Sequence, residues 1–232
     1  MLMMRFEDYF LDAGNVFRKD RCPDECRFKT LNSIPIVGVP LPQWPRRLQG
    51  VLVSRDPTIA FIEPYLNARD NLIEGWRHSL MAADAPPQWL VARVAEFDRK
   101  YMDGRHAFHL KKLGKVLEDN VYWTHLHKCC TDKAGKEAFP FSYENAYICG
   151  SCWLSRELSD AVALGAKFVL CLGTDVERFM YGREAPEKEQ VTVLCLPHPS
   201  GAAMGAWNPK NSMRRERIAD TIDELFRVVD NI

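Results

Sequence analysis

Two short polar segments of the sequence follow apolar runs and contain residues that can act together in a reaction. SRDPT (residues 54–58) follows one run, and HPSG (residues 198–201) follows another. A carboxylate such as Asp56 can orient a water molecule or stabilise a cation, and an imidazole such as His198 can hydrogen-bond a developing anion. Asp-Pro and His-Pro are also common turn sequences, so each segment taken alone is more typical of a turn. Their shared position after apolar runs favours a site.

Four β-rich runs are expected to position these residues. Each run is largely apolar, which is typical of strands buried on both faces of a parallel sheet: Gly50 to Ser54, Val121 to Leu126, Lys167 to Gly173, and Val191 to Pro197. Helical patterns occupy residues 87–101, 153–164 and 212–231. The alternation predicts an α/β fold, a three-layer α/β/α sandwich with a central four-stranded, mainly parallel sheet. In such sheets the ligand lies beyond the carboxyl ends of the strands.

The length of 232 residues is expected to form a single domain, residues 1–232. Within it, residues 1–49 are interpreted as an N-terminal helix and arm, and residues 59–86 as an insertion. The opening segment MLMMRFEDYFLDAG carries acidic residues, so it predicts an amphipathic helix rather than a signal peptide. No apolar run approaches the roughly 20 residues needed to span a membrane. A cytoplasmic, nucleoid-associated protein without a membrane partner is therefore expected.

Charge does not identify a partner, whereas cysteine content is informative. The formal net charge is zero, which neither supports nor excludes a nucleic-acid partner. Eight cysteines without a secretory signal suggest metal ligation or burial rather than disulfides. Cys171 and Cys195 lie inside apolar runs and are expected to behave as small buried hydrophobic side chains.

Several segments together resemble the uracil-DNA glycosylase superfamily. LPHPS (residues 196–200) is similar to the second motif of that family, and SRDPT is similar to the first motif, Gly-Gln-Asp-Pro-Tyr in the best-known branch. The segment GRHAFHLKKLGKVLEDNVYWTHLHKC (residues 104–129) resembles the iron–sulfur branch, which reads Gly-Arg-Pro-Phe, a helix, and Val-Tyr-Ile-Thr-Asn leading to Lys-Cys. The similarity covers most of the chain after Gly50. It implies hydrolysis of the N-glycosidic bond of a deaminated base, uracil first, in base-excision repair, by a monomer.

The resemblance also implies roles for individual residues. Asp56 and His198 are expected to be catalytic, with Asp56 activating water and His198 stabilising the departing base. Phe108 is expected to stack on the flipped base, with Pro57 and Ser200 beside it. The loop GAAMGAWNPKN (residues 201–211) is expected to contact DNA through Met204, Trp207 and Lys210. Met204 or Trp207 would be the apolar wedge that enters the base stack, unless Trp207 only packs the loop.

Four cysteines match the metal ligands of the iron–sulfur branch. The ligand set implied by the resemblance is Cys22, Cys26, Cys129 and Cys152, with Cys130 and Cys149 as substitutes. The first pair has three intervening residues, Pro-Asp-Glu, instead of the usual two. Four thiolates suit a [4Fe–4S] cluster or, as the alternative, a zinc ion.

Two positions depart from the family pattern. His125 stands where uracil-specific members carry an asparagine that reads the base edge, and a neutral imidazole also offers a donor and an acceptor. Thr58 replaces a tyrosine that excludes the thymine methyl group. The sequence therefore leaves open a glycosylase for another base such as hypoxanthine, and a DNA- or abasic-site-binding protein without strong activity. An unrelated zinc-stabilised α/β enzyme acting on a small molecule is a further alternative.

Overall fold

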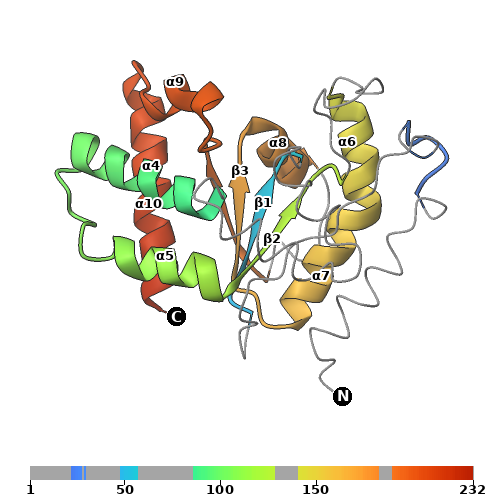
Figure 1. Cartoon of the computed structure of the whole chain (residues 1–232), viewed down its shortest axis with the longest axis horizontal. Helices are drawn as coiled ribbons and strands as arrows, with labels where there is room; N and C mark the ends of the chain where they lie inside the picture. The colour runs from blue at the N-terminus through green and yellow to red at the C-terminus, as the bar shows by residue number, and fades with distance from the viewer. Residues whose placement is uncertain are drawn as a thin grey trace, which may run out of the picture.

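The four predicted strands form one parallel sheet in a computed structural model of the chain (Figure 1). The model describes residues 22–27, 29, 48–56, 86–128, 141–182 and 190–231. The sheet order is β2-β1-β3-β4, and every pairing is parallel. The strands are β1 (Gly50–Ser54), β2 (Val121–His125), β3 (Phe168–Leu172) and β4 (Thr192–Leu196). The expected four-stranded α/β architecture is confirmed, and the sheet is parallel throughout its described strands.

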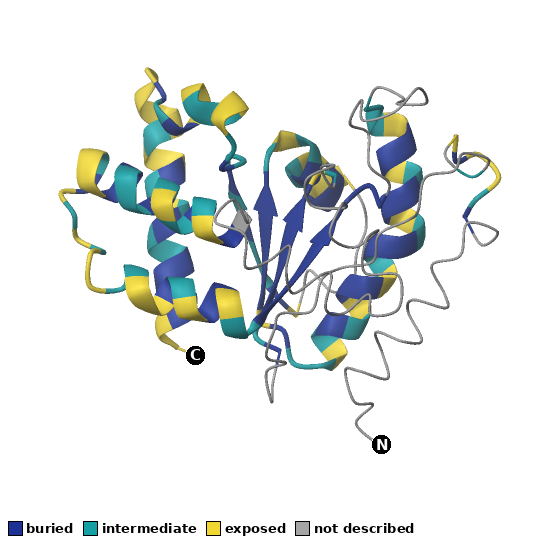
Figure 2. Ribbon diagram, viewed as in Figure 1, coloured by how far each residue is buried: buried dark blue, intermediate teal, exposed yellow. Residues whose placement is uncertain are grey.

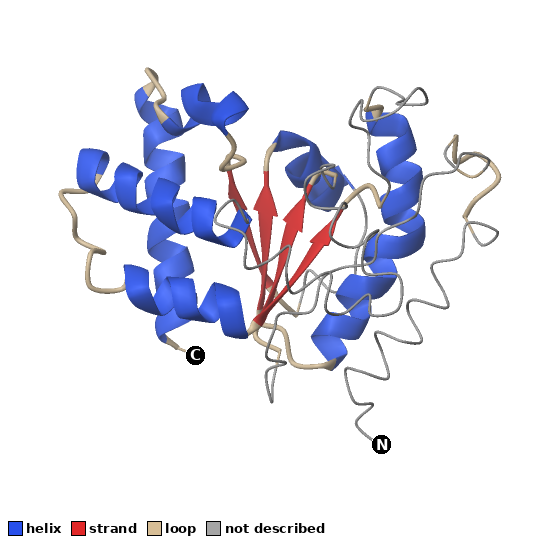
Figure 3. Ribbon diagram, viewed as in Figure 1, coloured by secondary structure: helices blue, strands red, loops and turns tan. Residues whose placement is uncertain are grey.

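Helices cover both faces of this sheet, as the layers in Figure 3 show. One face carries α4 (Pro86–Tyr101), α5 (Leu110–Asp119) and α10 (Ser212–Asp230). The other face carries α6 (Tyr143–Cys149), α7 (Ser155–Ala163) and α8 (Thr174–Gly182). The helical patterns at 87–101 and 212–231 are confirmed within one residue. The pattern at 153–164 corresponds to α7 and to the π-helical segment before it.

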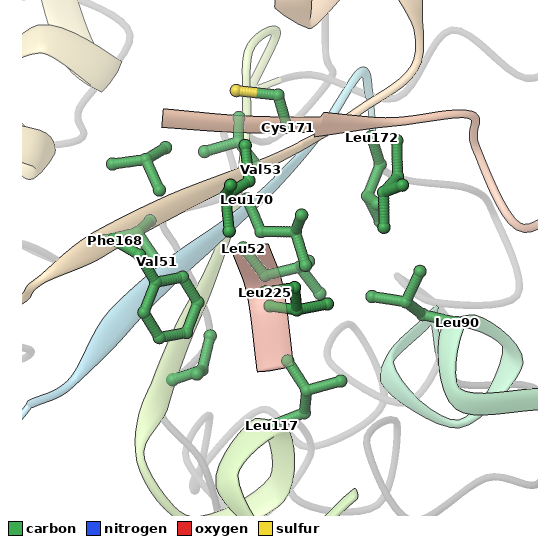
Figure 4. Close-up of a cluster of buried hydrophobic side chains, with 14 of the residues drawn as sticks. Val51, Leu52, Val53, Leu90, Leu117, Phe168, Leu170, Cys171, Leu172 and Leu225 are labelled. Carbon is green, nitrogen blue, oxygen red and sulfur yellow. The ribbon is translucent and has the colours of Figure 1, made fainter. Parts of the chain in front are cut away.

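Burial follows the prediction for a doubly covered sheet. Every residue of β1, β2 and β3 is buried, whereas the edge strand β4 is partly accessible (Figure 2). In Figure 4, leucines from three helices gather around the strand leucines of one face. Leu90, Leu117 and Leu225 come from α4, α5 and α10, and each is fully buried or nearly so. The apolar runs are therefore strands because both of their faces are buried.

A π-helical segment, η2 (Gly150–Leu154), joins α6 to α7. Gly150 packs so tightly here that a Cβ atom would lie 2.5 Å from Leu126 Cδ1 and 2.9 Å from Phe179 Cε2. A larger residue at this position would require the Leu126 or Phe179 side chain to move, so glycine suits the approach of the helix to the end of β2. Single π turns within α-helices often mark functional positions. This one contains Cys152 and directly follows Cys149.

A buried ion pair links the end of β2 to α7. Lys128 Nζ donates to Glu157 Oε2, and the two side chains are 0% and 1% exposed. Lys128 Nζ also donates to Thr124 Oγ1 at 2.6 Å, and the Thr124 hydroxyl donates to Glu157 at 2.8 Å. The Tyr122 hydroxyl donates to the other carboxylate oxygen at 2.8 Å. Hydrogen bonds on both partners offset the desolvation that makes buried charges costly.

Two segments predicted from the sequence, the N-terminal arm and the insertion, lie largely outside the described residues. Most of the proposed arm (residues 1–49) and nearly all of the proposed insertion (residues 59–86) lie outside the described residues. The insertion's last residue, Pro86, begins α4. Among the helices that the structure describes, none has the length and apolar content required to cross a lipid bilayer.

Breaking the buried ion pair is expected to destabilise the fold. Lys128→Met leaves the Glu157 carboxylate buried without its cation, which typically costs about 3–5 kcal/mol of unfolding free energy. Urea denaturation followed by circular dichroism measures this loss. Lys115→Met is the matched control, because the Lys115–Asp119 pair on α5 is exposed and contributes little. Equal stability of both variants would contradict a structural role for the Lys128–Glu157 pair.

Candidate active site at the carboxyl edge of the sheet

Asp56 and His198 lie at the same edge of the sheet, as their positions after β1 and β4 predict. They are close enough for the Asp56 carboxylate to act electrostatically on the His198 imidazole. The Asp56 side chain is 9% exposed and His198 is half-buried. Gly173, at the end of the intervening strand β3, has φ +94°, and a Cβ atom there would lie 3.6 Å from His198 Cβ. The positive φ, rather than lack of space, favours glycine at this position beside His198.

The local backbone selects the tautomer of His198. The Ser200 backbone N–H donates to His198 Nδ1 at 3.2 Å, so Nδ1 is the acceptor and a neutral ring carries its proton on Nε2. Burial lowers the pKa of His198, and the positive charge of Arg55 lowers it further, while Asp56 opposes the shift. The neutral imidazole thus presents an Nε2–H donor rather than a positive charge. Such a donor can stabilise negative charge as it develops on a substrate.

Trp207 anchors the backbone at His198 through a hydrogen bond. Its indole Nε1–H donates to the His198 backbone carbonyl at 3.0 Å, and its ring packs edge-on against Phe97 of α4. The side chain is 3% exposed within α9 (Met204–Trp207). Trp207 therefore packs the loop in this structure, the second of the two roles expected for it. Met204 is half-buried and Lys210 is exposed, both on the segment that follows His198.

A second support comes from α4. Arg93 Nε donates to the Pro199 carbonyl at 3.3 Å, and Arg93 also pairs with Glu96 at 2.9 Å. Lys100 and Tyr101 of the same helix donate to the Asn208 side chain at 2.6 and 3.4 Å. The chain after β4 is thus fixed to α4 at both ends of the short helix pair η4 (Gly201–Ala203) and α9.

The residue that sequence reasoning missed is Arg55. Its Nε donates to Asp56 Oδ1 at 2.5 Å. In the sequence, Arg55 stands out only as part of the SRDPT motif. A basic residue next to a candidate catalytic carboxylate is the signal that was available in the sequence. Its side chain must fold back onto its own neighbour to make the contact, and local sequence does not specify that rotamer.

His125 is buried at the same edge of the sheet, at the end of β2. It ends β2, pairs in register with Ser54, and is 1% exposed. Burial lowers its pKa far below the usual range, and Lys128, His198 and His127 lower it further. Its ring centroid is 5.4 Å from that of Trp123. His125 is therefore a neutral imidazole near His198, and its role in reading a base remains a prediction.

Phe108 is not brought together with Asp56 and His198. It lies in the turn between α4 and α5 and is 96% exposed. The flanking residues bind the second half of α10: His106 Nε2 lies 2.6 Å from Asp223, and the His106 ring stacks on Phe226 at 4.4 Å. Because α10 runs back along the sheet after β4, this turn lies away from the strands' carboxyl ends (Figure 1). Pro57 lies outside the described residues.

Cysteine-bearing segments converge beside α6 and α7. Cys22 and Cys26 are buried, and the next backbone N–H, of Arg27, donates to the Asn145 side chain on α6 at 3.0 Å. Burial raises the pKa of the Cys152 thiol, and the neighbouring Cys26 raises it further. The segment after β2 joins the same region, since the Lys128 backbone N–H donates to Cys149 Sγ at 3.3 Å. The thiol of Cys149 is thus adjacent to the residue that precedes Cys129, and Cys26 of the N-terminal segment lies near Cys152.

The predicted metal ligands are only partly described. Cys129 and its substitute Cys130 lie outside the described residues. Within the described ranges, no group of three or more His, Cys, Asp or Glu side chains is placed to hold a metal ion. The proximity of Cys26 to Cys152 fits the donor chemistry of a thiolate-bound group. Both candidates for the fourth ligand, Cys149 and Cys152, face this region from one helical stretch.

No protein-family model matches this chain, and no curated protein matches it either.

The hydrogen bond from Trp207 yields a test of its packing role. Trp207→Phe keeps most of the buried ring but removes the donor to the His198 carbonyl, which is expected to cost about 1–3 kcal/mol of unfolding free energy. Thermal and urea unfolding measure the loss. Trp89→Phe, at a half-buried position on α4, serves as the control. Unchanged stability of Trp207→Phe would instead favour the wedge role.

Proposed function

We propose that this protein is a DNA glycosylase that hydrolyses the N-glycosidic bond of a flipped-out deaminated base, with uracil as the first candidate. The observation that carries the proposal is the placement of Asp56 and a neutral His198 at one edge of a parallel sheet. The His198 tautomer, with its proton on Nε2, suits a hydrogen bond to an anionic leaving base. The motifs around both residues resemble those of uracil-DNA glycosylases.

The chemistry requires the target nucleotide outside the duplex, because the stack hides the glycosidic bond. Asp56 orients a water molecule towards C1′ and stabilises the positive charge that develops on the sugar, as carboxylates do in glycoside hydrolysis. The C1′–N bond breaks with its electron pair moving to the base. The His198 Nε2–H then hydrogen-bonds the base oxygen on which negative charge accumulates. The oriented water forms the new C1′–O bond as its proton passes to the Asp56 carboxylate, and the departed base anion takes up a proton from solvent.

Other residues would serve binding rather than bond cleavage. Ser200 anchors the His198 ring through its backbone N–H, and the exposed Lys210 and half-buried Met204 lie on the segment that would meet DNA. His125 lies near His198 at the end of β2, which suits a role in base selectivity. Because an imidazole replaces the asparagine of uracil-specific enzymes, hypoxanthine is the second base to test.

The cysteines would hold a [4Fe–4S] cluster, with zinc as the alternative. Cys22, Cys26, Cys129 and Cys152 are the proposed ligands, and Cys149 is the substitute for the fourth. When bound, the group would supply a structural link between the N-terminal segment, the end of β2 and the start of α7. The proximity of Cys26 to Cys152 supports this grouping.

A DNA- or abasic-site-binding protein of the same fold is the second candidate function. The observation that favours it is the state of Asp56, whose carboxylate is held by Arg55 and is only 9% exposed. A carboxylate in that state must still reach a water molecule for hydrolysis to occur. The two functions separate on whether bases are released.

Base release from defined oligonucleotides tests the glycosylase function. Wild-type protein is expected to produce alkali-labile abasic sites in DNA that contains uracil, and hypoxanthine, xanthine and mismatched thymine are tested in parallel. Asp56→Asn and His198→Ala are each expected to lower the single-turnover rate about 10²–10³-fold, because each removes an electrostatic contribution to the transition state. Asp119→Asn on α5 is the matched control and should retain full activity. Binding to these DNAs without release of any base would favour the binding protein.

Metal analysis of the purified protein tests the proposed cluster. Anaerobically purified protein is expected to be brown and to contain iron, since iron–thiolate ligation absorbs visible light. Cys22→Ser and Cys26→Ser should lose the metal, and comparing Cys149→Ser with Cys152→Ser identifies the fourth ligand. Cys171→Ala is the control, because Cys171 is buried in β3. Zinc in place of iron would select the alternative, and full metal content in Cys22→Ser would exclude the proposed ligand set.

A further inference from the structure

Arg55 spans the carboxyl edge of the sheet between three elements. It directly follows β1, and its Nε donates to Asp56 Oδ1 at 2.5 Å. The guanidinium carbon lies 4.2 Å from the centre of the Phe141 ring, just before α6. Nη1 lies 4.0 Å from Asp175 Oδ2 in the first turn of α8. The side chain is 45% exposed, yet contacts on two sides hold its orientation.

We propose that Arg55 is a positioning residue of the Asp56–His198 site, which fixes the Asp56 carboxylate through Nε and places a positive charge at the edge of the sheet that also carries His198. This proposal rests on the proposed function for its catalytic meaning. The effects of Arg55 on the position of Asp56 and on the charge around His198 can be measured without any substrate.

The charges around His198 favour this assignment. Among the described residues, the charged or titratable groups that the contacts place around this edge include Arg55 and Asp56 after β1, His125 on β2, Arg93 on α4 and Asp175 on α8. Asp56 is the neighbour that raises the pKa of His198, and Arg55 opposes it. Without Arg55, the Asp56 carboxylate would act unopposed and would raise the pKa of His198, while burial, the larger cause, would still lower it. Arg55 therefore adds to the preference of this ring for its neutral form.

The contacts require an arginine rather than any cation. A guanidinium is planar, so it can stack on the Phe141 ring while its edge donates to Asp56 in a fixed direction. A lysine ammonium has no planar face and no directional Nε–H. Lysine at this position therefore keeps the charge near His198 but loses the orientation of the carboxylate, and the two effects can be separated.

Titration of His198 by NMR in the full-length protein tests the charge effect. Arg55→Gln is expected to raise the pKa of His198, because the opposing positive charge is gone while Asp56 remains. Arg55→Lys should raise it less, and Asp56→Asn should lower it. Arg178→Gln is the matched control, since Arg178 on α8 stacks on Tyr143 at 4.1 Å instead. An unchanged His198 titration in Arg55→Gln overturns the proposal.

Kinetics on the best DNA substrate test the positioning effect. Both Arg55→Gln and Arg55→Lys are expected to lower kcat about tenfold or more with KM little changed, because the carboxylate loses its orientation for the transition state. A change confined to KM would make Arg55 a DNA contact and overturn the proposal. If wild-type protein releases no base, the proposed function fails, whereas the His198 titration still decides whether Arg55 sets the charge at this site. Circular dichroism of both variants shows whether the fold is retained, and Arg55→Lys is the more conservative of the two.

Discussion

The rest of the structure depends on the register of the parallel sheet, in which the strands end at the same level. Val53 of β1 pairs with Thr124 of β2 and with Cys171 of β3, and Leu172 of β3 pairs with Leu196 of β4. The four strands therefore end at one level, and the residues that follow them share one edge. Backbone hydrogen bonding at that edge, from Leu126 to Ser54 and from Gly173 to Leu196, extends the pairing beyond the strands. Because of this register, Asp56 and His198 lie at the same edge of the sheet.

Two cations shape the electrostatics at this edge in different ways. Lys128 is fully buried and satisfied by Glu157 and Thr124, so it adds rigidity and a positive potential beneath His125. Arg55 is partly exposed and orients Asp56. Both cations disfavour protonation of the nearby imidazoles. Under the proposed function, the neutral imidazoles would serve as hydrogen-bond donors rather than as ion-pair partners.

The buried Lys128–Glu157 pair also connects the two candidate sites. It anchors the end of β2 to α7, directly before Cys129 and within the helical stretch that carries Cys149 and Cys152. A buried ion pair seldom adds net stability compared with apolar packing, but its partners must meet in one geometry. The pair therefore specifies the path of the chain from His125 at the sheet edge towards the cysteines.

Much of the fold follows from local sequence because burial on two faces produces a recognisable pattern. The apolar runs predicted each strand within about one residue, and the amphipathic stripes predicted α4 and α10. The short helices α6 and α8 were not predicted, since they span only 7 and 9 residues and give a periodic pattern of few apolar positions. Asp56 and His198 were predicted to share an edge, because parallel strands bring their carboxyl ends together whatever the side chains are.

The roles of individual side chains depended on tertiary structure. Trp207 was an equal candidate for wedge and packing residue until its indole was found bonded to the His198 carbonyl. Phe108 matched a motif, but its turn is held against α10, far along the chain. Arg55 and Lys128 were ordinary basic residues in the sequence. The periodicity of apolar residues indicates which positions of a helix or strand are buried. A hydrogen-bond partner on a distant element leaves no such pattern in the local sequence. Only the folded chain therefore determines which side chains become partners.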